Sequence, residues 1–193
     1  MSSANPVFTI GHSTRSTDEL IALLNEHGVA RLLDVRRFPG SRRHPHFSRE
    51  ALAASLGAVG IEYAHEPGLG GRRKGRSDSP HTAWRVAGFR AYADHMESDE
   101  FRAAFSRLVD RAEAKRTAIM CAEATPWRCH RQLIADALTA RGHEVLHILG
   151  PGRTQPHALN PAARLLPDGR LLYPADGDEQ MKLFDPDEPS PTD

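Results

Sequence analysis

Short apolar segments alternate with longer segments of helical periodicity along most of the chain, and this alternation limits the fold more than any other feature. Strands are predicted over residues 7–10, 31–36, 61–64, 117–121 and 144–149. Such alternation favours parallel strands joined by crossover helices. We therefore expect an α/β fold with an open, mostly parallel, Rossmann-like sheet and helices on both faces. Pro167-Asp168-Gly169, between two short apolar runs, predicts an additional C-terminal β-hairpin.

Composition changes near the C-terminus of this chain of 193 residues. Residues 1–174 are predicted to form a single α/β domain, and residues 175–193, rich in Asp, Glu, Pro and Ser, a disordered acidic tail. The sequence has no apolar run long enough to span a membrane, no signal-peptide pattern, and only two cysteines, both in one short segment. We therefore expect a cytoplasmic protein that does not bind membranes.

Both cysteines lie in residues 120–131, where a predicted strand gives way to a predicted helix. Thr125 is the expected N-cap of this helix and Pro126 its first residue. A thiol at a helix start near arginines has its thiolate favoured, so Cys121 or Cys129 is a candidate nucleophile; the alternative is that both pack in the core. The Cys-x7-Cys-His spacing matches no common zinc pattern, so no metal ligands are assigned. No nucleotide-cofactor motif is present, and the cofactor is left unassigned.

Arginines and histidines gather around the predicted carboxyl ends of the strands, which suits phosphate groups. Aromatic side chains interleave with them after the second strand, as in sites that bind nucleotides or nucleic acid; a solvated basic loop is the alternative. The candidate phosphate- or nucleic-acid-binding residues are Ser13, Arg36, Arg37, Arg42, Arg43, Arg128, His130 and Arg131.

Carboxylates stand out against this positive background. Asp34 and Glu123 each follow a predicted strand, and His12 follows the first strand. Because the carboxyl ends of parallel strands meet at one edge of a sheet, these residues are expected to lie together. Either carboxylate, with His12, is a candidate for general acid–base catalysis; pairing with an arginine or capping a helix is the alternative.

The acidic tail contains one short apolar motif, with Gln180, Met181, Leu183 and Phe184 as its candidate contact residues. An isolated Leu-Phe pair in such a tail is suited to a groove on another protein. The motif is similar to the pentapeptide that binds the bacterial sliding clamp, which makes that clamp a candidate partner.

Several short motifs together resemble a bacterial family called domain of unknown function 488, over roughly residues 7 to 174. They are Thr9-Ile10-Gly11-His12-Ser13, Leu33-Asp34-Val35-Arg36 with Pro39, Ser41 and Arg42, Leu69-Gly70-Gly71, Tyr92, and Cys121-Ala122-Glu123 with Cys129-His130-Arg131. The resemblance implies that the elements around Asp34, Cys121 and Cys129 belong to one site, but it supplies no reaction.

The leading hypothesis is an enzyme that acts on DNA or a nucleotide and hydrolyses a glycosidic or phosphodiester bond. In this hypothesis the enzyme is associated with DNA repair, and the sliding clamp delivers it to DNA. Two alternatives remain open. One is a non-catalytic nucleic-acid-binding module, whose binding would depend on arginines and not on Cys121 or Glu123. The other is a thiol- or metal-dependent enzyme that acts on a small metabolite.

Overall fold

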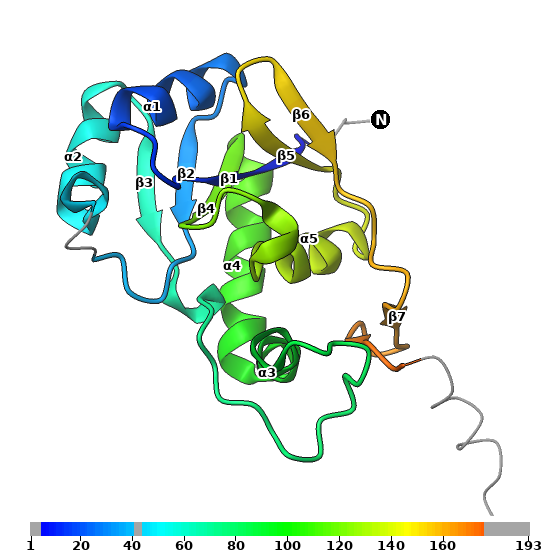
Figure 1. Cartoon of the computed structure of the whole chain (residues 1–193). Helices are drawn as coiled ribbons and strands as arrows, with labels where there is room; N and C mark the ends of the chain where they lie inside the picture. Colours follow the sequence, from blue (N-terminus) through cyan, green and yellow to red (C-terminus); the bar gives the residue numbers. More distant parts are fainter. Residues whose placement is uncertain (1–4, 41–43, 176–193) are drawn as a thin grey trace, which may run out of the picture.

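A six-stranded sheet forms the centre of the molecule (Figure 1). The structure is a computed structural model, and it describes residues 5–40 and 44–175. The strand order is β3-β2-β4-β1-β5-β6, in which β1 to β5 are parallel and β6 is antiparallel to β5. This confirms the predicted open, mostly parallel α/β sheet. The strands are β1 (Val7–Gly11), β2 (Arg31–Asp34), β3 (Glu62–His65), β4 (Thr117–Cys121), β5 (Val145–Gly150) and β6 (Arg153–Pro156).

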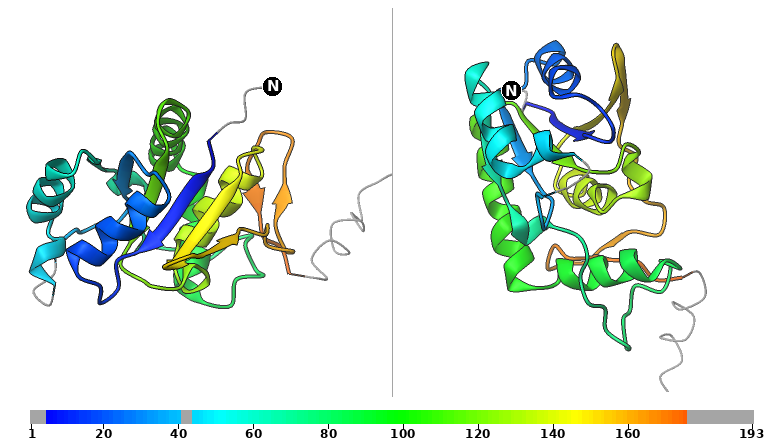
Figure 2. Two further views of the ribbon diagram at one scale, coloured as in Figure 1. Left: turned by 90° about the horizontal axis from the view of Figure 1, so that it is seen from above. Right: turned by 60° about the vertical axis from the view of Figure 1, so that its left-hand side comes forward.

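Helices cover both faces of the sheet, as the left view of Figure 2 shows. Helices α1 (Thr17–Glu26) and α2 (Arg49–Ala58) pack on one face. Helices α4 (Asp99–Ala114) and α5 (Arg131–Thr139) pack on the other, together with α3 (Ala87–Met96). Side chains alternate between these two layers along each strand: in β4, Ile119 lies in one apolar cluster and Met120 in the other.

Local signals in the sequence explain several helix starts. Ser16 and Glu19 form the predicted capping box of α1, since the Glu19 amide donates to the Ser16 hydroxyl and the Ser16 amide to the Glu19 carboxylate. Ser48 caps α2 by accepting from the amide of Ala51 at 3.3 Å. These caps satisfy amides that have no partner within the helix.

The predicted helix start at Thr125 and Pro126 is wrong. A single 3-10 turn, η3 (Pro126–Arg128), follows β4, and α5 begins only at Arg131. Cys129, between them, has extended backbone angles (φ −137°, ψ 151°), which interrupt the helix. This interruption lets the side chains of both Cys129 and Arg131 enter the protein interior, where they are 4% and 1% exposed.

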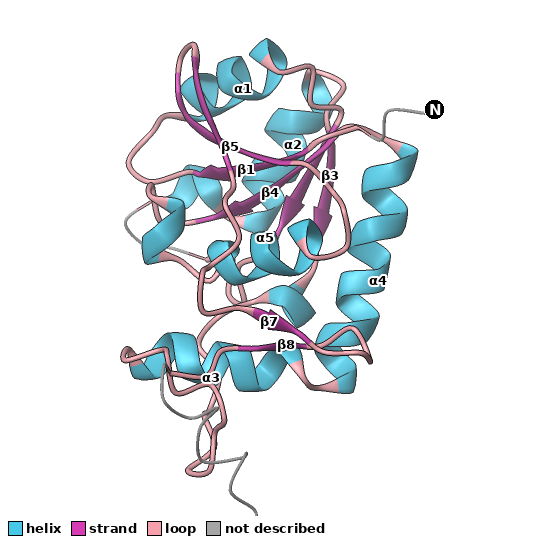
Figure 3. Ribbon diagram, turned by 90° about the vertical axis from the view of Figure 1, so that its right-hand side faces the viewer, coloured by secondary structure: helices cyan, strands magenta, loops and turns pink. Residues whose placement is uncertain are grey.

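The C-terminal hairpin is present as β7 (Arg164–Leu165) and β8 (Leu171–Leu172), beside α3 (Figure 3). Tyr173 follows it and is fully buried, with its carbonyl accepting from the amide of Ala83 at 3.0 Å. Strand β6 was not predicted, because its four residues are all exposed and show no apolar alternation. In the described part of the chain, no helix has the length and apolar character needed to cross a bilayer.

Candidate functional site

Three chain segments meet where β2, β4 and β1 end side by side (Figure 1). The amide of His12 donates to the carbonyl of Cys121 at 3.0 Å, and the amide of Ser13 donates to that of Ala122 at 2.9 Å. Across the neighbouring pair of strands, the amide of Val35 donates to the carbonyl of Met120 at 2.9 Å. The structure therefore brings together the three strand ends that the sequence predicted would share one edge.

Two adjoining cavities of about 270 and 610 Å³ open at this edge, and we call them together the cleft. Arg36, Phe38, Gly40, Arg72, Ala122 and Glu123 line both cavities. The smaller cavity also reaches the two cysteines and His130, and the larger one reaches His12, Ser13, His44 and Arg128. Glu123 is the only carboxylate among the described lining residues, so the cleft is strongly cationic.

Asp34 holds Arg36 in place at the floor of the cleft. Its buried carboxylate accepts from Arg36 Nε at 2.9 Å and Nη2 at 2.6 Å, and from the Tyr63 hydroxyl at 2.8 Å. Arg36 Nη2 also donates to the carbonyl of Phe47 at 2.8 Å. The Asp34 carboxylate is therefore occupied by positioning Arg36, which is itself only 7% exposed.

His12 completes this network as a neutral imidazole. Arg36 Nη1 lies 3.3 Å from His12 Nε2, and His12 Nδ1 lies 3.0 Å from the carbonyl of Ser13. We assign the proton to Nδ1, which leaves Nε2 to accept from Arg36. Burial, and next the charge of Arg36, lower the pKa of His12 to about 4.

The two cysteines lie beside His130 at the other end of the cleft. Cys129 Sγ is 3.5 Å from His130 Nδ1, and His130 Nε2 donates to the carbonyl of Val35 at 3.1 Å. The amide of Arg131 donates to Cys129 Sγ at 3.5 Å. Because His130 carries its hydrogen on Nε2 to donate to the Val35 carbonyl, its Nδ1 has a free lone pair, and this atom faces the Cys129 sulfur. This is the arrangement of a thiol, a base and a group that orients the base.

The two thiols differ in acidity. Burial raises the pKa of Cys121 well above its ordinary value, and the hydrogen bond that Cys121 makes to Cys129 raises it further. Burial also opposes ionisation of Cys129, but three other factors outweigh it: a hydrogen bond from Cys121, the hydrogen bond and charge that His130 supplies once its Nδ1 has taken the thiol proton, and the charge of Arg131. The pKa of Cys129 therefore lies well below its ordinary value. The pair holds one negative charge most readily on Cys129.

Arg131 lies behind the sulfurs and does not face the open cleft. Its guanidinium donates from Nε to Cys121 Sγ at 3.0 Å, from Nη1 to the Thr9 hydroxyl at 3.2 Å, and from Nη2 to the carbonyls of Glu123 and Ala124. Sequence reasoning grouped Arg131 with the phosphate-binding arginines, whereas the structure places it against sulfur and backbone.

The other predicted residues either line the cleft or lie outside the part of the chain that the structure describes. Ser13, Glu123 and Arg128 line the cleft, and Arg37 lines it while also donating to the carbonyl of Arg72 at 2.9 Å. Arg42 and Arg43 lie outside the described residues. The same holds for the tail residues Gln180, Met181, Leu183 and Phe184.

Sequence reasoning did not place Arg72 among the candidate site residues, and it noted Phe38 only as one of the interleaved aromatics and Gly70 and Gly71 only as part of a family motif. A Cβ on Gly70 would lie 2.8 Å from the Arg37 backbone, and one on Gly71 would lie 3.0 Å from His130 Nδ1. The Gly-Gly pair thus lets a basic loop approach both sides of the cleft. Ser13 and Arg72 both have positive φ, 48° and 57°, which is unusual for residues with a side chain. The Gly-Gly-Arg-Arg sequence at residues 70–73 was the signal from which this basic loop could have been predicted to belong to the site.

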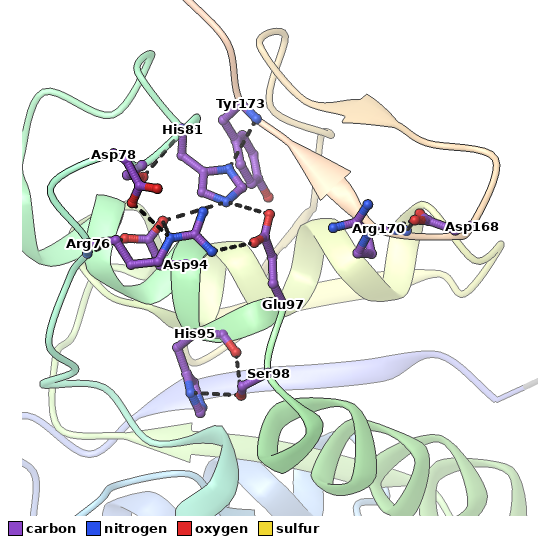
Figure 4. Close-up of polar contacts among 11 residues, drawn as sticks. Arg76, Asp78, His81, Asp94, His95, Glu97, Ser98, Asp168, Arg170 and Tyr173 are labelled. Atoms are coloured by element: carbon purple, nitrogen blue, oxygen red, sulfur yellow. Dashed lines mark hydrogen bonds and ion pairs between the residues drawn. The ribbon is translucent and has the colours of Figure 1, made fainter.

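A second polar cluster lies outside the cleft, between α3 and the C-terminal hairpin (Figure 4). His81 is fully buried there, accepts from the amide of Tyr173 at 3.4 Å, and faces Glu97 at 3.3 Å and Asp94 at 4.0 Å. Arg76 bridges the same two carboxylates. The cluster joins α3 to the end of the hairpin. Within residues 5–40 and 44–175, no group of three or more His, Cys, Asp or Glu side chains is arranged to hold a metal ion.

Comparison with known proteins identifies the family but no reaction. Neither a curated protein nor a solved structure matches the chain. The family model described as "Domain of unknown function DUF488" matches residues 16–138, which include Asp34, Arg36 and the whole segment from Cys121 to Arg131. This match covers more than half of the sequence and confirms the resemblance seen in the motifs. The chain belongs to the DUF488 family.

Proposed function

We propose that this protein is a cysteine-dependent enzyme that acts on a phosphate-bearing substrate, a nucleotide or DNA, and that Cys129 is its nucleophile. The observation that carries the proposal is the buried guanidinium of Arg131, which donates to the Cys121 sulfur behind a Cys129–His130 pair. Both sulfurs line the cationic cleft.

Electrostatics favour an ionised sulfur at this position. Arg131 is 1% exposed, and in the described part of the chain its guanidinium bonds only to sulfur, a hydroxyl and carbonyl oxygens. A buried cation without a counter-ion costs several kcal/mol. The thiols of Cys121 and Cys129 are the acidic groups in hydrogen-bond contact with Arg131, so one thiolate offsets this cost.

The proposed reaction is hydrolysis of a phosphodiester. His130 Nδ1 takes the Cys129 proton, and the thiolate attacks phosphorus, so that an S–P bond forms and the P–O bond to the leaving alcohol breaks. The leaving oxygen takes the proton from His130. Water then attacks phosphorus and gives its proton to Glu123 or His130. The S–P bond breaks, which releases the phosphate product and restores the thiolate.

The rest of the cleft supports a phosphate-bearing ligand with an aromatic base. Arg36 uses four of its five donors on Asp34, Phe47 and His12, which leaves one Nη1 hydrogen beside the cavities it lines. Arg37, Arg72 and Arg128 add further cationic side chains. Phe38 is 65% exposed on the cleft wall, where its ring is available for stacking on a base.

The test combines thiol chemistry with turnover. Trypsin cleaves after Arg116, Arg128 and Arg131, so Cys121 and Cys129 fall in different peptides, and alkylation of each by iodoacetamide can be followed against pH by mass spectrometry. Cys129 is expected to react with a midpoint well below that of an ordinary thiol, and Cys121 to stay unreactive. An ordinary thiol midpoint for Cys129 would contradict the proposal.

Turnover is then assayed on bis(p-nitrophenyl) phosphate, dinucleotides and single-stranded oligonucleotides. Cys129→Ser is expected to abolish hydrolysis and His130→Ala to reduce it at least a hundredfold. The non-catalytic alternative predicts instead that oligonucleotides bind without being cleaved, that Arg72→Ala weakens binding, and that Cys129→Ser does not. Delivery by the sliding clamp remains a separate proposal, based on the motif of the tail alone.

A further inference from the structure

A buried line of hydrogen bonds runs from the sulfurs of the cleft to Asp136 on α5. It starts at Arg131, whose Nη1 donates to the Thr9 hydroxyl at 3.2 Å. The Thr9 hydroxyl lies 2.7 Å from His147 Nδ1, and His147 Nε2 lies 3.0 Å from His157 Nδ1. His157 Nε2 ends the line 2.8 Å from the Asp136 carboxylate. We call Thr9, His147 and His157 the relay.

Only one direction of donation satisfies every member. The direction is set from both ends: Arg131 can only donate to the Thr9 oxygen and Asp136 can only accept, so with neutral imidazoles the Thr9 hydrogen points to His147 Nδ1. His147 then carries its proton on Nε2 and donates to His157 Nδ1. His157 in turn donates from Nε2 to Asp136, which can only accept. Each imidazole therefore has a single tautomer, set by its neighbours.

The relay joins two opposite charges that are both buried on α5. Arg131 and Asp136 are each 1% exposed. Asp136 is fully engaged, because its carboxylate also accepts from the amide of Asn160 at 2.9 Å and from the Tyr173 hydroxyl at 3.0 Å. Aligned hydrogen bonds between buried charges strengthen one another and hold the end groups in one geometry.

We propose that His147 and His157 are positioning residues that, through Thr9, hold the Arg131 guanidinium against the sulfurs of Cys121 and Cys129. This inference rests on the proposed function, since the ionised thiol is the group that Arg131 serves. His147 lies on β5, and His157 directly follows β6. The antiparallel edge strand, which the sequence did not predict, therefore brings His157 next to His147. Burial, then the nearby His157 and Arg131, lower the pKa of His147 to about 4, which keeps its Nδ1 free to accept from Thr9.

The test compares two isosteric changes. Thr9→Val removes the hydroxyl that links Arg131 to His147. Thr117→Val is the matched control, because Thr117 is equally buried, lies on the neighbouring strand β4, and bonds only to the carbonyls of Arg111 and Lys115 at the other end of that strand. Both variants lose one buried hydroxyl at nearly constant volume, so a general loss of stability affects them alike.

A second comparison concerns the far end of the relay. His157→Leu removes both of its hydrogen bonds, whereas His157→Gln can still accept from His147 and donate to Asp136. The readout is the pH midpoint of iodoacetamide alkylation of Cys129, measured on the full chain, with thermal melting to confirm folding. Thr9→Val and His157→Leu are expected to raise the midpoint by about one pH unit, which lowers the alkylation rate about tenfold at pH values below the wild-type midpoint. Thr117→Val and His157→Gln are expected to stay within about twofold of the wild-type rate.

The inference is overturned if folded Thr9→Val alkylates like the Thr117→Val control, or if His157→Gln shifts the midpoint as much as His157→Leu. If His157→Leu does not fold, the pair of threonine variants decides the matter alone. A failure of the proposed function gives a different result from a failure of this inference. In that case Cys129 of the wild-type protein has the alkylation midpoint of an ordinary thiol, and the behaviour of the Thr9 and His157 variants does not matter.

Discussion

Replacing Asp34 by Asn tests the network at the floor of the cleft. Asp34 is fully buried and accepts four hydrogen bonds: from the amide, Nε and Nη2 of Arg36 at 3.0, 2.9 and 2.6 Å, and from the Tyr63 hydroxyl at 2.8 Å. An amide at this position removes the counter-charge of a guanidinium that is only 7% exposed, and it directs an N–H group at donors.

The expected cost follows from this burial. Removing one partner of a buried ion pair lowers the free energy of unfolding by about 3–5 kcal/mol, because the remaining charge stays buried and unpaired. Asp34→Asn combined with Arg36→Met removes that orphaned charge as well. The double variant is therefore expected to be more stable than Asp34→Asn alone, with a coupling energy of about 2 kcal/mol or more.

Glu62→Gln on the neighbouring strand β3 is the matched control. Glu62 pairs with Arg31 at 3.0 Å, but its side chain is 43% exposed, so its loss is expected to cost less than about 1 kcal/mol. Urea unfolding at pH 7, followed by tryptophan fluorescence, measures all five proteins: wild type, Asp34→Asn, Arg36→Met alone, the double variant and Glu62→Gln. If Asp34→Asn costs no more than Glu62→Gln, or if Arg36→Met destabilises Asp34→Asn further, the reasoning is refuted.

Three further predictions concern pH, sterics and the tail. The pKa values of His12 and His147 are about 4 in the folded protein against 6.5 ordinarily, so the unfolded chain binds more protons below pH 6.5. Urea unfolding should therefore show full stability above that pH and, by pH 5, a loss of about 2 kcal/mol for each histidine, about 4 kcal/mol together. An unchanged midpoint over this range would contradict it. Gly11→Ala places a Cβ 1.7 Å from the carbonyl oxygen of Glu123, so we expect a loss of 3 kcal/mol or more, about the upper end for overpacking, and a melting temperature close to wild type would disprove the clash. Deletion of residues 180–184 should abolish capture of the bacterial sliding clamp in a pull-down while leaving the melting temperature unchanged; equal capture by the truncated chain would remove the clamp as a partner.

The order of helices and strands was accessible from the sequence because it depends on local patterns. Apolar periodicity marked β1 to β5, and Ser16 and Ser48 marked the starts of α1 and α2. The same patterns placed three polar strand ends on one edge, because parallel strands share a direction. Strand β6 was not predicted, because an exposed edge strand with the sequence Arg-Thr-Gln-Pro has no apolar alternation.

The roles of the polar residues were not accessible in this way, because charge compensation depends on contacts across the fold. For Asp34 the sequence left open both acid–base catalysis and pairing with an arginine, and the structure shows Arg36 paired with Asp34 and in contact with His12. Arg131 was predicted to bind phosphate, but the extended backbone at Cys129 directs the Arg131 side chain into the protein interior. Thr9, His147 and His157 lie far apart in the sequence and form a line only in the folded sheet.

The sequence by itself determined the α/β architecture, the family, and the edge of the sheet at which reactive residue types gather, since periodicity and strand direction are local properties. Only the tertiary structure decided which of those residues line the cleft and which hold others in place. The physical reason is that a buried charge takes its partner from whichever segment the fold brings to it, here a thiol pair for Arg131 and an arginine for Asp34.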